Sequence, residues 1–484
     1  MRGPVPPYLA SHVDRIESYQ REWVLDTYLL LTGERAATDR RIHERYRELN
    51  DGRLLHSALE RGDRSYARAL ANAYFAAAPA LADAGDRLRA AQPELVATMG
   101  GESFGIQQLR LRAASEHDAA KRAALEDQAL VLLERRGALE RSWVEAHADV
   151  SRSLGFARHA DLIQALEGDV APWLRHAERW LERTRADFLS RWRAWRERDQ
   201  ISTGPFTPYL GHEPSVANGA ADMPTSVRAT ATAWGFGQEA GRIPIDVVPR
   251  PGKSPLSFCA RIAPPRDVRV TTHASTNPLN YGILLHEFGH ALHFSLGPDR
   301  PFDLYGDHQA ITEAFGMTFM FVATQAEWYD RFLGAPIGAE DLERVRFLVE
   351  ASRRLDATHV LYEYAVHAGS SDPAEEFRRL YRREFEADVT PHLAYFRMQL
   401  FLEGRPFYPL YLHQANSMRA TLWNELTAVG GHHWYIGDGC RSHLVERFRR
   451  TCEVDLPEWL TLIGSALPSE SSELSESSDA APDS

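Results

Sequence analysis

The stretch Leu284-Leu285-His286-Glu287-Phe288-Gly289-His290-Ala291-Leu292-His293 contains the pattern His-Glu-x-x-His in an apolar, helix-forming setting. Residues four apart on a helix lie on one face, so His286 and His290 can offer two imidazoles to one cation. Glu287 then lies beside that cation, where it can act as general base on a metal-bound water. Asn277-Pro278 is a typical helix start. The stretch therefore predicts a helix that carries two ligands of a catalytic zinc ion.

A catalytic zinc site needs three protein ligands and one open position for water. The metzincin pattern would supply the third ligand from a His at position 296 after a Gly at position 293, but the sequence has Leu296 and His293. His293 shares the face of the two predicted ligands, either as a hydrogen-bonding partner of them or as a packed core residue. His293 is therefore not a predicted ligand, and the third ligand is expected further along the chain.

Glu313 is the predicted third ligand. It precedes a markedly apolar stretch at 314–323, where an ionised carboxylate is costly unless it is paired or coordinated. A cation held jointly with His286 and His290 removes that cost, so we predict one Zn²⁺ per chain on these three residues. A buried salt bridge with an arginine is the alternative role for Glu313. The alternative third ligands are Asp307 and His308, which precede the predicted helix.

Periodicity divides the rest of the chain into parts. Helical spacing of apolar residues runs to about residue 200, and a Gly- and Pro-rich stretch follows. An alternating pattern of apolar and polar residues around the turn Pro249-Arg250-Pro251-Gly252 then predicts one small sheet between residues 243 and 275. Helical spacing then returns. The last residues of the sequence are acidic and contain few apolar side chains, so this tail is predicted to be disordered. The predicted parts are an N-terminal helical part (1–200), an irregular connection (201–236), a catalytic part with the sheet and the zinc-binding helices (237–467) and a disordered tail (468–484).

Composition excludes several classes of protein. The 484 residues hold 55 Lys and Arg against 67 Asp and Glu, a net charge of −12, so the chain lacks the general basicity that nucleic-acid binding requires. Three cysteines form no disulfide framework and favour a reducing compartment. The N-terminus lacks the apolar segment of a signal peptide, and no apolar run is long enough to cross a bilayer. We therefore expect a cytoplasmic protein with no membrane or nucleic-acid partner.

Several segments carry a resemblance to a known family. Residues 249–259 (PRPGKSPLSFC), followed by an alternating strand and HEFGHALH, resemble the thimet oligopeptidase and oligoendopeptidase F family of zinc metallopeptidases. Weaker similarity is found at 154–162, 381–385 and 434–439, and the strand at 268–275 resembles the edge strand of angiotensin-converting enzyme. The resemblance implies a mainly α, two-lobed body with a deep substrate channel, zinc at its floor and short peptides as substrates. It also implies that the strand near His273 to Ser275 aligns the substrate backbone.

The same resemblance implies catalytic hydrogen-bond donors near the C-terminus. In such peptidases a late segment supplies Tyr and His side chains that stabilise the tetrahedral intermediate, and here Tyr408, Tyr411 and His413 are the candidates. The family's tyrosine-rich pattern is replaced by LHQANSMRATLW, with Arg419 where a tyrosine is expected. The departure predicts a substrate or rate that differs from the family norm.

The expected activity is zinc-dependent hydrolysis of peptide bonds in short peptides. Two alternatives stay open: a specialised enzyme that processes a dedicated peptide precursor, and a zinc-bound peptide-binding scaffold without catalysis. A general base at Glu287 speaks against a pure binder, which has no need of one. The sequence does not decide between endopeptidase and carboxypeptidase action, nor does it give the oligomeric state.

Overall fold

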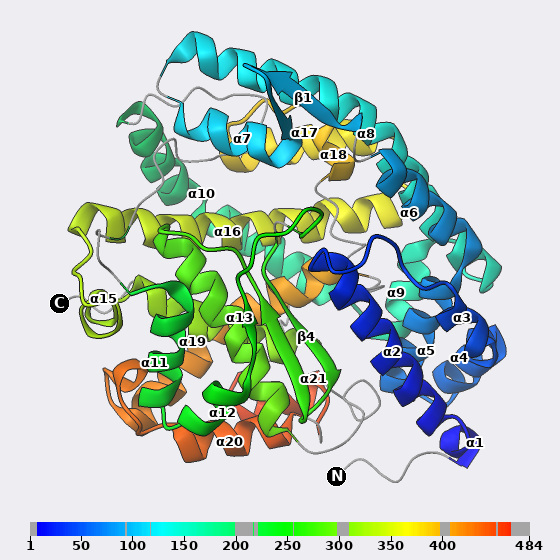
Figure 1. Cartoon of the computed structure of the whole chain (residues 1–484). Helices are drawn as coiled ribbons and strands as arrows, with labels where there is room; N and C mark the ends of the chain where they lie inside the picture. The colour runs from blue at the N-terminus through cyan, green and yellow to red at the C-terminus, as the bar shows by residue number, and fades with distance from the viewer. Residues whose placement is uncertain are drawn as a thin grey trace.

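The computed structural model describes residues 7–91, 94–116, 118–198, 216, 221–254, 256–297, 309–396, 407–451 and 454–465. Within these residues the chain is mainly helical, with two small sheets, and this confirms the predicted fold class (Figure 1). No helix in the described ranges is both long enough and apolar enough to cross a membrane. The predicted tail at 468–484 and most of the predicted connection lie outside the described residues.

The N-terminal part contains ten α-helices, one short 3-10 helix and one hairpin in its described residues. The elements are α1 (Pro7–Ala10), α2 (Val13–Leu31), α3 (Arg41–Arg45), η1 (Arg47–Asn50), α4 (Gly52–Glu60), α5 (Arg64–Ala77), α6 (Pro79–Ala91), β1 (Val96–Met99), β2 (Glu102–Gly105), α7 (Ile106–Ser115), α8 (Ala119–Ser153), α9 (His159–Glu167) and α10 (Ala171–Arg198).

The hairpin of β1 and β2 corrects the prediction of a single sheet. The two strands are antiparallel, and Met99 pairs with Glu102 across the turn. Gly100 and Gly101 both have positive φ angles, 60° and 86°, as a tight two-residue hairpin turn requires. Each strand has only four residues, too few for the alternating pattern to stand out within a helical region.

The remaining elements build the second half of the protein. They are α11 (Met223–Ala233), α12 (Gly237–Arg242), β3 (Ile245–Asp246), β4 (Phe258–Ala263), β5 (Asp267–Thr271), α13 (Pro278–Leu296), α14 (Gln309–Met320), η4 (Phe321–Thr324), α15 (Ala326–Phe332), α16 (Ala339–His367), α17 (Pro373–Phe385), α18 (Leu393–Phe396), α19 (Tyr408–Gly430), η5 (Trp434–Ile436), α20 (Arg441–Arg450) and α21 (Leu456–Leu462).

Helix α11 corrects the prediction of irregular chain throughout residues 201–236. The side chain of Asp222 accepts a hydrogen bond from the Thr225 backbone N–H at 2.8 Å, and Pro224 stands in the first turn. An Asp cap followed by Pro is a strong helix start. The Gly- and Pro-rich composition of the preceding residues concealed this signal.

The three-stranded sheet has the order β3-β5-β4, so β5 is central and β4 is an edge strand. Strands β4 and β5 are antiparallel, and Cys259 pairs with Val270. Helix α2 packs on β4 through Tyr28, Ala260 and Ile262. In Figure 1, α2 runs along one side of β4 and α13 lies on the other side. The sheet therefore separates an N-terminal helix from the helix that carries the His-Glu-x-x-His pattern.

The largest hydrophobic core surrounds α13, α14 and α19. A second core combines helices from both sides of the predicted connection: the rings of Phe188 on α10 and Phe347 on α16 stack with centroids 5.3 Å apart. Helix α10 packs against α16 and α17, and α8 packs against α18, so this core is shared by the two halves of the protein. A third core, built from residues between Leu9 and Leu166, lies within the N-terminal part. Burial of each such aromatic side chain contributes about 1.5–3 kcal/mol to stability.

Candidate active site

Helix α13 places His286 and His290 in the predicted arrangement. The helix begins at Pro278, and the Asn277 side chain accepts a hydrogen bond from the Leu279 N–H at 2.9 Å. The Nε2 atoms of His286 and His290 lie 2.9 Å apart, with the two rings nearly perpendicular. Both side chains are buried. One helical turn has thus brought two nitrogen donors to a single point.

Glu313 on α14 faces the same point. Its Oε2 atom lies 3.3 Å from Nε2 of His286 and 3.5 Å from Nε2 of His290. Ligands of a tetrahedral zinc ion, with bonds of 2.0–2.2 Å, are themselves roughly 3.3 Å apart. Among the described residues, these three form the only group of His, Cys, Asp or Glu side chains close enough to share a metal ion. The residues present therefore fit Zn²⁺ in both donor type and spacing.

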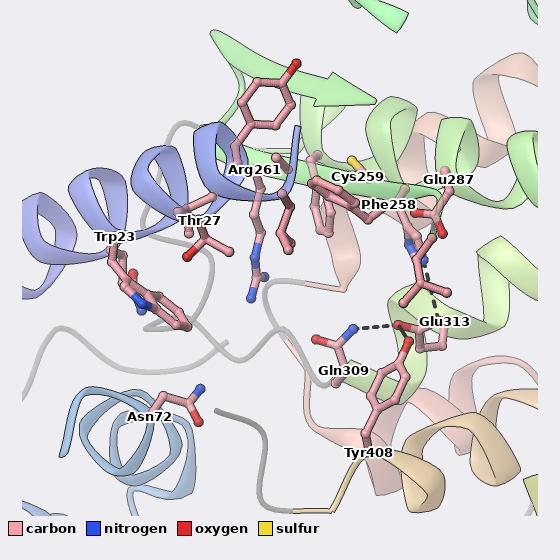
Figure 2. A pocket seen from close by; sticks show the side chains of 18 of the residues that line it. Trp23, Thr27, Asn72, Phe258, Cys259, Arg261, Glu287, Gln309, Glu313 and Tyr408 are labelled. Carbon is pink, nitrogen blue, oxygen red and sulfur yellow. Dashed lines mark hydrogen bonds and ion pairs between the residues drawn. The ribbon is translucent and has the colours of Figure 1, made fainter. Parts of the chain in front are cut away.

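The second oxygen of Glu313 is held by two hydrogen bonds. Oε1 accepts from Gln309 Nε2 at 2.7 Å and from the Tyr408 hydroxyl at 3.1 Å (Figure 2). These bonds turn Oε2 toward the two imidazoles. Tyr408, predicted as a catalytic donor, thus contacts a predicted metal ligand. Gln309 makes the same contact, although no motif in the sequence marks it.

Thr312 connects His290 to His293. Its hydroxyl lies 2.9 Å from Nδ1 of His290 and 3.1 Å from Nδ1 of His293, and Nε2 of His293 lies 2.8 Å from the Thr451 hydroxyl. Burial lowers the pKa of His293 to about 3, so this ring is neutral. His293 therefore belongs to the hydrogen-bonded support of the site. Thr312 was missed because nothing in the sequence marks it except its place beside Glu313.

Glycines allow α13 and α14 to approach closely. A Cβ atom on Gly316 would lie 2.6 Å from Cε1 of His286, and one on Gly289 would lie 2.3 Å from Cδ2 of Phe319. Both distances are far below van der Waals contact, so any larger residue would require the facing ring or the helices to shift. The two x positions of the His-Glu-x-x-His pattern are thus Phe288 in the core and a glycine at the helix crossing.

Electrostatics favour an ionised carboxylate at this point. Burial alone would raise the pKa of Glu313, but His290 and His286 outweigh it and hold that pKa well below the usual range. Burial likewise opposes charge on His286, yet the carboxylates of Glu313 and Glu287 raise its pKa. The site therefore holds negative charge that attracts a cation.

A cleft opens beside these residues. Glu287 is half-buried and lines the cleft, as do Phe258 to Arg261 of β4 and residues of α2 and α5. The cleft volume is about 210 Å³, against roughly 10–15 Å³ for one water molecule, so it can admit a peptide segment. The predicted substrate-aligning strand, near His273 to Ser275, is not the edge strand at the cleft. These residues follow β5, which is the central strand, and the His273 ring is bonded to the Ser254 carbonyl at 2.7 Å. The edge strand at the cleft is β4.

The predicted donors on α19 do not share one face. Tyr408 and Tyr411, three residues apart, both line the cleft, and the Tyr411 hydroxyl donates a 2.5 Å hydrogen bond to Glu167. His413 is two residues further, about 200° around the helix, and is not among the residues that line the cleft. It is buried, with Nε2 at 3.0 Å from Nδ1 of His176, and burial holds its pKa well below the usual value. This placement corrects the predicted position of His413 in the site.

The other residues singled out near this segment lie elsewhere. The guanidinium of Arg419 stacks on the ring of Phe321 at 4.1 Å, outside the cleft lining. Asp307 and His308, the alternative third ligands, lie outside the described residues.

Comparison with solved structures finds the same fold. A 3.1 Å X-ray structure assigned to an oligoendopeptidase F is matched with a TM-score of 0.64 at 16% identity, over 95% of this chain and 85% of that chain. Pz peptidase A with an inhibitor is matched with a TM-score of 0.59 at 12% identity, over 94% and 83%. An oligoendopeptidase F from Bacillus anthracis strain Ames is matched with a TM-score of 0.58 at 14% identity, over 92% and 81%.

No protein-family model and no curated protein sequence matches this sequence. The structural likeness extends over nearly the whole chain. The chain has the mainly α fold of the solved oligoendopeptidase F and Pz peptidase structures.

Proposed function

We propose that the protein is a zinc-dependent peptidase that hydrolyses short peptides. The observation that carries this proposal is the convergence of His286, His290 and Glu313 Oε2 on one point beside a cleft that Glu287 also lines. The fold shared with peptidases supports it. When bound, zinc polarises the scissile carbonyl and makes a water molecule acidic near neutral pH.

The residues of the chain have distinct roles in this mechanism. Glu287 accepts a proton from the attacking water and delivers it to the leaving amine. Tyr408 and Tyr411 are the tyrosines of α19 that line the cleft, so they are the candidates to stabilise the developing oxyanion. To do so, the hydroxyl of Tyr408 must turn away from Glu313, or that of Tyr411 away from Glu167. His413, directed toward His176, takes no part.

The outer edge of β4 can bind the substrate backbone. Residues Phe258 to Arg261 line the cleft, and among the described strands β4 is paired only with β5. A peptide that adds to this edge is held by main-chain hydrogen bonds, which are tolerant of sequence. Walls formed by α2 and α5 leave room for an extended segment, which favours short peptides over folded proteins as substrates.

Two substitutions test the proposal. Glu287→Gln should retain one zinc per chain and lose turnover of quenched fluorescent peptides, whereas Glu313→Gln should lose the zinc itself. Glu343→Gln, on the exposed surface of α16, is the matched control and should retain both. Full turnover by Glu287→Gln, or by protein stripped of metal, would contradict the mechanism. Bound zinc without cleavage of a broad peptide set would favour the binding scaffold, and cleavage of one precursor alone would favour the specialised enzyme.

A further inference from the structure

The cleft continues from the metal site to the helices α2 and α5. Glu287 and Glu313 lie at one end of it, and Trp23 on α2 and Asn72 on α5 lie at the other end (Figure 2). The Trp23 ring stacks on the ring of Tyr19, with centroids 6.4 Å apart and planes 2° apart, so its position in the wall is fixed. A peptide bound at the metal site therefore reaches this end only with residues that are remote from the scissile bond.

Asn72 projects from a part of α5 that otherwise lines the cleft with alanines. Ala69, Asn72 and Ala73 are three and four residues apart, so they share one face of the helix, and all three line the cleft. An alanine side chain ends at Cβ, so the carboxamide of Asn72 extends past its neighbours. Figure 2 shows it directed from α5 into the cleft, on the side away from β4.

The side-chain oxygen of Asn72 differs from other polar groups along the cleft. Oδ1 is buried, and no donor in the described part of the chain reaches it. The Ser257 hydroxyl, by contrast, lies 2.7 Å from the Thr272 hydroxyl. A buried polar atom without a hydrogen bond lowers the stability of the folded chain, so such atoms are uncommon outside sites that bind a ligand or water. A ligand that bonds to this amide removes the cost.

We propose that Asn72 binds the main chain of a substrate residue remote from the scissile bond, so that the protein prefers peptides long enough to reach it. This rests on the proposed peptidase function. A peptide that adds to the edge of β4 directs the N–H and C=O groups of every second residue away from the sheet. A carboxamide has both an acceptor and donors, and rotation about its terminal bond turns either toward the peptide. Asn72 can therefore pair with both groups of one such residue, whatever its side chain.

Peptide length provides the first measurement. Quenched fluorescent peptides are extended one residue at a time, on the N-terminal side of the scissile bond in one series and on the C-terminal side in another. For the wild-type protein, kcat/KM should rise by roughly fivefold or more at the step that brings the main chain to Asn72. The Asn72→Ala protein should lack that step. Length profiles that are identical for the two proteins would overturn the proposal.

Ester substitution locates the contact within the peptide. Replacing a single main-chain amide by an ester removes one N–H donor and leaves the side chains unchanged. At the position that pairs with Asn72, the ester should lower kcat/KM of the wild type by roughly fivefold and should not affect the Asn72→Ala protein. Esters at positions that pair with β4 should slow both proteins alike. Equal ester effects in both proteins at every position would contradict a contact with Asn72.

Further variants separate binding from folding. Asn72→Asp retains an acceptor for the peptide N–H, so its ester effect should persist. Asn424→Ala, the same truncation at an exposed position of α19, should behave as the wild type. Asn72→Ala should unfold at the same or a higher urea concentration, because alanine favours the helix and the unbonded oxygen is removed. A loss of stability in Asn72→Ala would assign the amide to the fold and overturn the proposal.

A binding measurement separates this proposal from the proposed function. Fluorescence anisotropy of the same labelled peptides with the Glu287→Gln protein requires no hydrolysis. One ester position should weaken binding to this protein by roughly fivefold and leave binding to the Glu287→Gln/Asn72→Ala protein unchanged. If the wild type cleaves no peptide but this difference is present, the peptidase function fails while the Asn72 contact stands. The absence of any such position would overturn the contact even where the wild type cleaves peptides.

Discussion

The backbone of Gly316 on α14 lies directly against the imidazole ring of His286 on α13. A Cβ atom there would be 2.6 Å from Cε1 and 2.7 Å from Nδ1 of that ring. Gly316→Ala should therefore displace His286 and lower zinc affinity by at least roughly tenfold, the usual effect of disturbing the support of a metal ligand. Zinc affinity is measured by competition with a chromogenic chelator.

A second glycine provides the control for that substitution. Gly241 lies in helix α12, and among the described residues outside its own stretch of helix no atom lies within 4 Å of the place its Cβ would occupy. Gly241→Ala should raise the free energy of unfolding by up to about 1 kcal/mol through helix propensity and leave zinc affinity unchanged. If Gly316→Ala also leaves zinc affinity unchanged, the close approach of α14 to His286 is not needed for metal binding.

Tyr408 should act on the metal site through Glu313. Tyr408→Phe removes the hydroxyl that donates to Glu313 Oε1 and leaves the bond from Gln309 to that oxygen in place. Zinc affinity should fall by about 10- to 100-fold. Tyr435→Phe is the matched control, because Tyr435 makes the same kind of bond, 3.1 Å to Glu327, away from the cleft. Equal zinc affinity of the Tyr408→Phe and wild-type proteins would show that the Tyr408 hydroxyl is not needed to position the carboxylate.

The sequence predicts the part of the site that depends on local spacing. Helix geometry alone brings His286 and His290 together, and the cost of a carboxylate in an apolar helix points to Glu313. Thr312 and Gly316 could not be predicted, because their roles arise where α14 crosses α13, and no pattern in a single sequence records which helices cross.

The errors in the fold have the same origin. An alternating pattern identifies the strands of the small sheet but does not show that β5 lies between β3 and β4, so the edge strand was misplaced. His413 was grouped with Tyr408 and Tyr411 by sequence proximity, although two residues along a helix reverse the direction of a side chain. The hairpin at Gly100-Gly101 was too short for its pattern to be recognised.

A buried ion pair joins the N-terminal helices to α16 and α17. Arg354 and Glu384 are both fully buried and bonded to each other, and Arg354 also donates to the Leu181 carbonyl of α10 at 3.0 Å. Glu384→Gln should lower the free energy of unfolding by about 3–5 kcal/mol, because it leaves a buried guanidinium without its counter-charge. Glu386→Gln, which breaks an exposed pair with Arg193, should have little effect in the same urea titration. Equal stability of the two variants would show that water reaches Arg354.

Stability should fall in acid through a buried histidine in the N-terminal part. Burial, reinforced by His159, lowers the pKa of His147 to about 3, against a usual value of 6.5. The unfolded chain therefore binds a proton at His147 below pH 6.5 that the folded chain binds only near pH 3, so stability is lost as pH falls through this window. Between pH 7 and 5 this histidine should contribute about 2 kcal/mol of the loss.

Urea unfolding at both pH values should show a smaller loss of stability for His147→Gln than for the wild type. His432→Gln, at an exposed position, is the control and should match the wild type. An identical pH dependence in His147→Gln would mean that the ring is already protonated in the folded protein.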